Sequence, residues 1–143
     1  MEVHHVMEML KRPTGFYLIA VAFAVAVHFV LDPVIYDWAD GETPPLWLVL
    51  DALMVAGLVL AIVFSCQAKR AADAMESVDV RQYVRANVTF YVAAGLLLLL
   101  LWNVVQIDWA AGDQQPDSQV WVAIDTVLPL LFFSLGRRLV REG

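Results

Sequence analysis

Hydrophobic and polar positions follow one another along the chain in long blocks rather than in a short amphipathic period. Four apolar stretches cover about residues 14–32, 46–68, 87–108 and 120–137, and polar segments separate them. At a rise of 1.5 Å per residue, a helix of about 20 residues crosses a hydrocarbon layer roughly 30 Å thick. The pattern predicts an all-α integral membrane protein with four transmembrane helices, forming a single domain over residues 1–143.

A shorter amphipathic segment precedes the first apolar stretch. Val3, Val6, Met7 and Leu10 recur at helical spacing, and the Pro-Thr-Gly sequence at 13–15 follows them. Apolar residues at this spacing are typical of a helix lying at a membrane surface, and proline followed by glycine favours a break. We therefore expect a short N-terminal interfacial helix that is separate from the first span.

The basic residues of the chain occupy only some of the polar segments. All nine Lys and Arg residues lie in three of these segments. They are Lys11 and Arg12 before the first span, Lys69, Arg70, Arg81 and Arg85 between the second and third, and Arg137, Arg138 and Arg141 after the fourth. The segments 32–45 and 108–119 contain acids and no base. Because basic loops stay in the cytoplasm, both ends of the chain are expected there, most simply in a bacterial or archaeal cytoplasmic membrane. In the inner segment, Ser77 is a candidate N-cap for the third span.

Composition agrees with this assignment and narrows the chemistry. Hydrophobic residues make up 61% of the chain, more than a soluble protein of 143 residues can bury in its core. The net charge of −6 is divided, with bases on the inner side and acids on the outer side, so it gives no indication of a nucleic-acid partner. A single cysteine, Cys66, excludes an internal disulfide.

The second half of the chain resembles the first at an offset of 74 residues. Phe16 and Tyr17 return as a second Phe-Tyr pair at 90–91, Trp47 returns at 121, and Asp51 returns at 125. Each copy, 14–68 and 87–138, contains two spans, so both copies enter the membrane from the same side. The expected arrangement is a tandem parallel repeat of two plus two helices, related by an axis along the membrane normal.

Two acidic residues lie inside the spans, where a charge is costly and therefore suggests function. Asp51 and Asp125 each follow a tryptophan by four residues, which places both about 6 Å inside the outer boundary. If they face each other, one carboxyl must keep a proton or a cation must bridge them. Pro129 cannot donate to the carbonyl of Asp125, so the fourth span has a kink that either adds an oxygen ligand or only shapes packing.

His28 and Asp32 lie one turn apart on the first span and have no counterpart in the second copy. Together with Asp51, Asp125, Asn103 and Gln106, they are candidates for one polar cluster near the outer surface. His28 and Asp32 are also a possible metal-ligand pair, and a histidine within a span can ligate a haem or chlorophyll. The alternative interpretation is a purely structural cluster of hydrogen bonds.

The sequence contains no nucleophile–base pair, phosphate-binding loop or zinc-protease motif, so we expect no enzyme activity. Our first hypothesis is a non-catalytic accessory or structural subunit, whose partners are membrane lipids and other membrane subunits or copies of itself. The second is a small cation- or proton-coupled transporter that uses the paired aspartates. The third is a metal- or cofactor-binding membrane protein acting through His28 and Asp32, and the sequence identifies no particular cofactor.

Overall fold

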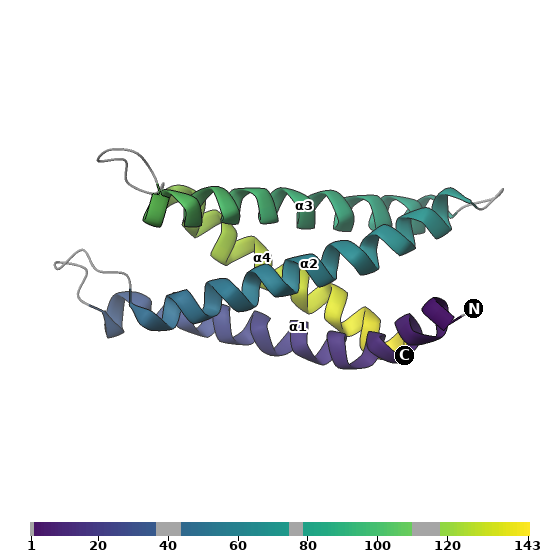
Figure 1. Ribbon diagram of the computed structural model, residues 1–143, viewed down its shortest axis with the longest axis horizontal. Coiled ribbons are helices and arrows are strands. Elements are labelled where there is room, and N and C mark those ends of the chain that lie inside the picture. Colours follow the sequence, from purple (N-terminus) through teal and green to yellow (C-terminus); the bar gives the residue numbers. More distant parts are fainter. Residues whose placement is uncertain (1, 37–43, 75–78, 110–117) are drawn as a thin grey trace. The chain divides into compact units, whose positions relative to one another are not determined.

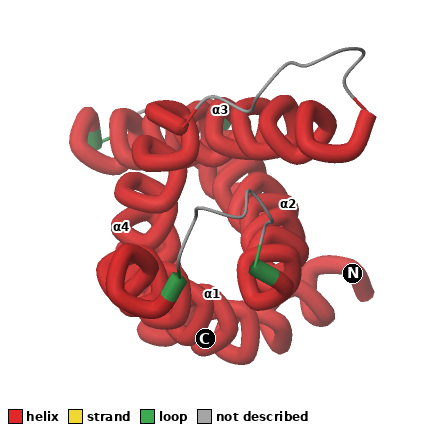
Figure 2. The backbone as a smooth tube through the Cα atoms, turned by 90° about the vertical axis from the view of Figure 1, so that its left-hand side faces the viewer, coloured by secondary structure: helices red, strands yellow, loops and turns green. Residues whose placement is uncertain are grey.

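The computed structural model describes residues 2–36, 44–74, 79–109 and 118–143, and these residues form four α-helices and no strand (Figures 1 and 2). The helices are α1 (Glu2–Ile35), α2 (Pro45–Asp73), α3 (Val80–Trp109) and α4 (Ser118–Glu142). Each is long and apolar enough to cross a membrane. The prediction of an all-α, multi-pass membrane protein is therefore confirmed.

Large apolar side chains cover the outer faces of all four helices. Val30 and Val34 on α1, Val49 on α2, Leu98 on α3 and Leu130 on α4 are all exposed. In water, apolar surface of this extent would favour aggregation, whereas in a bilayer it lies in contact with lipid tails. Both the exposed apolar faces and the helix lengths therefore agree with insertion into a membrane.

The N-terminal segment is part of the first membrane helix, because α1 continues through Pro13 without interruption. The separate interfacial helix expected from the sequence is therefore not confirmed. A proline removes one hydrogen bond and bends a helix, but it ends the helix only if nothing else holds the segment. Here Thr14 and Gly15 are buried, and Gly15 packs against Gly136 of α4, so tertiary contacts keep this segment helical.

The start of α3 is fixed by Asp79. Its side-chain Oδ1 accepts a hydrogen bond from the backbone N–H of Arg81 at 3.1 Å, and its carbonyl accepts the N–H of Gln82 at 2.9 Å. An acidic side chain that accepts a backbone N–H in this position is an N-cap. Ser77, the candidate cap from the sequence, lies outside the described residues, as do most of the two acidic segments.

The chain divides into two compact units by the proximity of its Cα atoms. The first unit contains residues 1–57 and 125–143, which are α1, the beginning of α2 and most of α4. The second contains residues 58–124, which are the rest of α2, all of α3 and the first turns of α4. Fully buried side chains occur in both, such as Val25 and Phe132 in the first unit and Leu100 and Ile124 in the second.

Two glycines allow α1 and α4 to approach closely within the first unit. A Cβ built on Gly15 would lie 2.7 Å from the carbonyl oxygen of Gly136, and a Cβ built on Gly136 would lie 2.7 Å from that of Gly15. In α2, a Cβ on Gly57 would lie 2.6 Å from the ring of Phe132 of α4. Glycine at a helix crossing lets the backbones meet, which is how membrane helices gain packing energy without a hydrophobic driving force.

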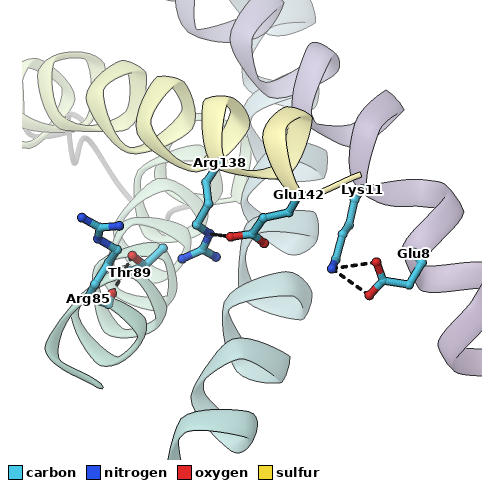
Figure 3. Close-up of polar contacts among 6 residues, drawn as sticks. All are labelled: Glu8, Lys11, Arg85, Thr89, Arg138 and Glu142. Atoms are coloured by element: carbon cyan, nitrogen blue, oxygen red, sulfur yellow. Dashed lines mark hydrogen bonds and ion pairs between the residues drawn. The ribbon is translucent and has the colours of Figure 1, made fainter. Parts of the chain in front are cut away.

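The C-terminal end of α4 lies beside α1 within the first unit, at Lys11 and Arg12 (Figure 1). A Cβ built on Gly143 would lie 3.1 Å from that of Lys11. Charged side chains here pair within their own helices, Lys11 with Glu8 at 2.7 Å and Arg138 with Glu142 at 3.7 Å (Figure 3). Short pairs of this kind between partly exposed side chains contribute little to stability.

The predicted tandem repeat is not confirmed, because equivalent positions have different surroundings. The hydroxyl of Tyr17 donates a hydrogen bond to the carbonyl of Leu53, whereas Tyr91, its counterpart, is exposed. His28 is buried, whereas Trp102, at the same position of the second copy, is exposed. The units also do not follow the copies, since the fourth helix is divided between them.

Candidate functional site: a buried polar cluster in the first unit

Four ionisable side chains of the first unit form what we call the acid cluster: His28, Asp32, Asp51 and Asp125. α1 supplies His28 and Asp32 one turn apart, α2 supplies Asp51, and α4 supplies Asp125. All four were candidates from the sequence. Helical spacing explains their placement, because each helix presents its acid on the same side as its buried apolar residues.

Trp47 connects α1 to α2 beside this cluster. Its indole Nε1–H donates a hydrogen bond of 2.6 Å to Oδ1 of Asp32. The ring of His28 lies edge-on to the same indole, with 4.6 Å between centroids, and 5.5 Å from the ring of Tyr36. Trp47 therefore holds Asp32 through its polar edge while its ring packs against the imidazole.

Three side chains of the acid cluster are buried and lack hydrogen-bond partners for some of their polar atoms. His28, Asp51 and Asp125 are only 7%, 8% and 6% exposed. Among the described protein groups, His28 Nε2, Asp51 Oδ1 and Asp125 Oδ1 have no hydrogen-bond partner. A buried polar atom without a partner costs about 1–3 kcal/mol, and more when it carries charge. Such atoms are kept in a fold where a proton, an ion or water completes them.

The carboxylates of the cluster also act on one another. Asp51 and Asp32 lie close enough to Asp125 to interact electrostatically with its carboxyl. The bases of the first unit are far along the helices, since Arg12 precedes His28 by about 24 Å and Arg137 follows Asp125 by about 18 Å at 1.5 Å per residue. Repulsion between the acids is therefore not offset by a Lys or Arg described in this unit.

Pro129 lies one turn after Asp125 and is buried. Because proline has no N–H, the main-chain carbonyl of Asp125 lacks its usual helical donor. That oxygen lies on the same residue as the unpartnered carboxyl Oδ1, so α4 offers two oxygen acceptors at one position. The interpretation of Pro129 as a kink that contributes a ligand remains a prediction.

Asn103 and Gln106 belong to the second unit. Asn103 is fully buried, and neither its Nδ2 nor its Oδ1 has a hydrogen-bond partner among the described residues. Gln106 is half-buried. Their membership of the acid cluster remains a prediction.

The metal hypothesis for His28 and Asp32 receives no support from the contacts. Within the described parts of the chain, no three His, Cys, Asp or Glu side chains come together as a metal-binding group. Oδ1 of Asp32 already accepts the indole N–H of Trp47. His28 Nε2 is still available, so a ligand at His28 remains a prediction rather than a finding.

The sequence pattern used Trp47 only as a repeated residue at the outer boundary and gave it no place in the site. The structure shows it as the residue that positions Asp32. The signal that could have identified it is its indole N–H, which needs an acceptor when the ring is buried. The Tyr17–Leu53 hydrogen bond, 2.8 Å long, was missed in the same way, because its acceptor is a main-chain carbonyl.

Comparison with protein-family models, with curated proteins and with solved structures finds no match to this chain. Its function is therefore inferred from the burial, charge and contacts of the acid cluster.

Proposed function

We propose that this chain is a small membrane transport protein that binds a proton or a cation at Asp51 and Asp125. The observation that supports this function is the pair of buried carboxyl groups whose Oδ1 atoms have no hydrogen-bond partner among the described residues. Both carboxylates cannot remain charged in a low-dielectric interior without compensation. A bound proton or cation removes that cost, and its release restores it, so the occupancy of the site changes the energy of the helix packing around it.

The distribution of basic residues indicates which side of the membrane the acid cluster is near. With the basic segments in the cytoplasm, the acid cluster lies near the outer ends of the helices and both chain ends lie inside. Asp32 lies near the outer water boundary, and Asp51 and Asp125 lie about one turn deeper. Ions from the outer side would reach Asp32 first. The cytoplasmic membrane of a bacterium or archaeon is the setting that this charge pattern favours.

Glycines and a proline in the helices that carry the acid cluster suggest how these helices could rearrange on ion binding. Gly15 and Gly136 bring the backbones of α1 and α4 together, and Gly57 of α2 makes room for the ring of Phe132 of α4. Pro129 weakens the main-chain ladder of α4 next to Asp125. Binding at the acid pair would therefore favour one arrangement of α4, and release would favour another. We propose no catalysed reaction for these residues.

The proposal is tested by proton and cation flux in liposomes that contain the purified protein and an internal pH-sensitive dye. Asp51→Asn and Asp125→Asn should each lower the flux by about tenfold or more, since each removes a charged ion-binding group from the interior. Asp73→Asn is the matched control, because Asp73 is exposed and forms a surface ion pair with Lys69. Flux equal in all three variants, or wild-type flux equal to that of empty liposomes, would contradict the proposal.

A second candidate function, a subunit of a larger membrane assembly, is favoured by a separate observation on α3. Along α3, a series of residues recurs at alternating spacings of four and three, and all except the glycine are large, exposed and apolar or aromatic. The series is Val84, Val88, Tyr91, Gly95, Leu98, Trp102 and Val105. This spacing is the seam of a left-handed helix pair. A Cβ at Gly95 would meet nothing within 4 Å. We call this series the α3 seam.

The partner for the α3 seam would be another membrane subunit or a second copy of this chain. Purification in a mild detergent should then yield a larger particle of fixed stoichiometry, and Gly95→Leu should disrupt it by filling the seam. Leu130→Ala on the exposed face of α4 is the control that leaves the seam intact. A homogeneous monomer in mild detergent would count against this function.

A further inference from the structure

We propose that an anionic phospholipid binds along one side of the α1–α4 pair, with its phosphate group on arginine side chains and an acyl chain on phenylalanine rings. We call the residues that form this surface the Arg-Phe face. They are Arg12, Phe16 and Phe23 of α1 and Phe133, Arg137 and Arg141 of α4. The inference goes beyond ion binding at the acid cluster and does not depend on it.

Helical spacing places the residues of the Arg-Phe face on one side of each helix. On α4, Phe133, Arg137 and Arg141 follow one another at intervals of four. The three residues of α1 lie at intervals of four and seven. Both intervals keep side chains on the same side of an α-helix. All six side chains are exposed, so this side of each helix points away from the buried interior of the first unit.

Contacts between α1 and α4 bring these two sides together. The rings of Phe23 and Phe133 meet edge to face, with 5.8 Å between their centroids. Nearer the chain ends, a Cβ built on Gly143 would lie 3.2 Å from the backbone nitrogen of Arg12. Arg12 therefore lies beside the end of α4 that carries Arg141. The Arg-Phe face is thus one surface, basic near the chain ends and aromatic toward the middle of the helices.

The side chain of Arg137 is held toward the middle of α4. Side chains of an α-helix lean toward its N-terminus, and in α4 that direction leads into the apolar stretch. The guanidinium carbon of Arg137 accordingly lies 5.6 Å from the centroid of the Phe133 ring, one turn back along the helix. A guanidinium on an aromatic ring can still donate two parallel hydrogen bonds to a phosphate. Because Arg137 stands at the end of the apolar stretch, its position suits an anion at the level where lipid phosphates meet acyl chains.

The arginines of the Arg-Phe face have no anionic partner in the part of the chain that the structure describes. None of the three forms an ion pair there. The acids described nearby are engaged by other bases (Figure 3). Glu8 pairs with Lys11 at 2.7 Å. Glu142 pairs with Arg138 at 3.7 Å. Bases therefore outnumber acids at this end of the first unit, and basic pockets between membrane helices are binding sites for anionic lipid headgroups.

The phenylalanine rings favour a lipid over a soluble phosphate. Phe16 and Phe23 are 56% and 58% exposed, and both lie in the apolar stretch of α1. An acyl chain attached to a phosphate at Arg137 would run along these rings into the bilayer. Its contact with them adds dispersion attraction that a phosphate without a chain cannot make.

The test measures lipid binding to the purified protein in mild detergent by native mass spectrometry. The two probes are phosphatidylglycerol, which is anionic, and phosphatidylcholine with the same acyl chains, which has no net charge. In about 0.15 M salt, phosphatidylglycerol should bind about fivefold or more tightly, because each nearby base attracts an anionic lipid.

Substitutions locate the site. Arg137→Gln should remove most of the preference for phosphatidylglycerol. Arg137→Lys should keep part of it, since lysine retains the charge and loses the planar fork that binds phosphate. Arg70→Gln is the matched control, because Arg70 is an exposed base of the second unit and its loss changes the net charge equally. This control should change the preference by less than about twofold, because salt screens general attraction.

Three results would overturn the inference. Equal binding of the two lipids would show that no site selects the anion. An equal loss of preference in Arg137→Gln and Arg70→Gln would show only a general attraction of anionic lipid to a basic surface. Glycerol phosphate, which has the phosphate group and no acyl chain, should bind far more weakly than phosphatidylglycerol; equal affinity would assign the arginines to a soluble phosphate.

A second measurement uses the protein without a substitution in the Arg-Phe face. In wild-type protein labelled with ¹⁹F-phenylalanine, the resonances of Phe23 and Phe133 should shift when phosphatidylglycerol is added to phosphatidylcholine nanodiscs. The resonance of Phe90 on α3, whose ring packs against Tyr91, is the control and should shift less. Equal shifts at all three rings would contradict a site on α1 and α4. Loss of ion flux in the aspartate variants would leave each of these results unchanged.

Discussion

The crossing of α1 and α4 gives a sharp test of the packing in the first unit. In Gly136→Ala, the added Cβ would lie 2.7 Å from the carbonyl oxygen of Gly15 and 2.8 Å from Cγ1 of Ile19. An ordinary contact begins at 3.4 Å, so the two helices would have to separate by several tenths of an ångström. The nearest atom belongs to the backbone of α1, which cannot rotate away as a side chain can.

The expected change in the free energy of unfolding follows from two opposing effects. Overpacking of this kind costs about 1–3 kcal/mol. Replacing glycine by alanine inside a helix gains about 1 kcal/mol. Gly95→Ala is the matched control, because it has the same gain and its added Cβ would meet nothing within 4 Å. The helix term cancels between the two variants, so Gly136→Ala should be less stable than Gly95→Ala by about 1–3 kcal/mol.

The assay is reversible unfolding in mixed micelles, with increasing SDS and helix content followed by circular dichroism. We expect Gly95→Ala to have the highest free energy of unfolding and the wild type a lower one. Gly136→Ala should be close to the wild type or below it. Gly15→Ala should behave as Gly136→Ala does, since its Cβ would lie 2.7 Å from the Gly136 carbonyl. Equal stability of Gly136→Ala and Gly95→Ala would refute the close crossing.

Two further variants test contacts outside the acid cluster. Tyr17→Phe removes the 2.8 Å hydrogen bond to the Leu53 carbonyl, so the same SDS titration should show a loss of about 0.5–1.5 kcal/mol, whereas Tyr91→Phe should change nothing. Asp79→Ala removes the N-cap of α3 and should cost about 0.5–2 kcal/mol, with faster amide exchange at residues 81–83, and Asp79→Asn should keep most of the stability. No difference between alanine and asparagine at position 79 would contradict the capping role.

The acid cluster shows how far helical spacing carries a prediction of a site. Asp51, Asp125 and His28 were selected because an ionisable group inside a span is costly, and all three are buried in one unit. Spacing along one helix could not show that Trp47 donates to Asp32, because that contact joins α1 to α2. Asn103 was selected by the same reasoning as the others, and its burial in the second unit leaves its role as a prediction.

By itself, the sequence determined the class of the protein and the number of its membrane helices. Lipid is a uniform solvent that requires every backbone group to be satisfied within the segment, so an apolar stretch of sufficient length has one structure open to it. Local signals near the helix ends were less decisive: Pro13 favoured a break, but the packing of Gly15 against Gly136 holds α1 as one helix.

Only the tertiary structure decided which helices meet and which polar atoms are left without partners. Membrane helices attract one another through close fit and a few hydrogen bonds, not through burial of apolar area, and fit depends on the shapes of both surfaces. Those shapes cannot be read from one helix at a time. The unpartnered oxygens of Asp51 and Asp125 emerged from that fit, and they are the basis for the proposed binding of a proton or a cation.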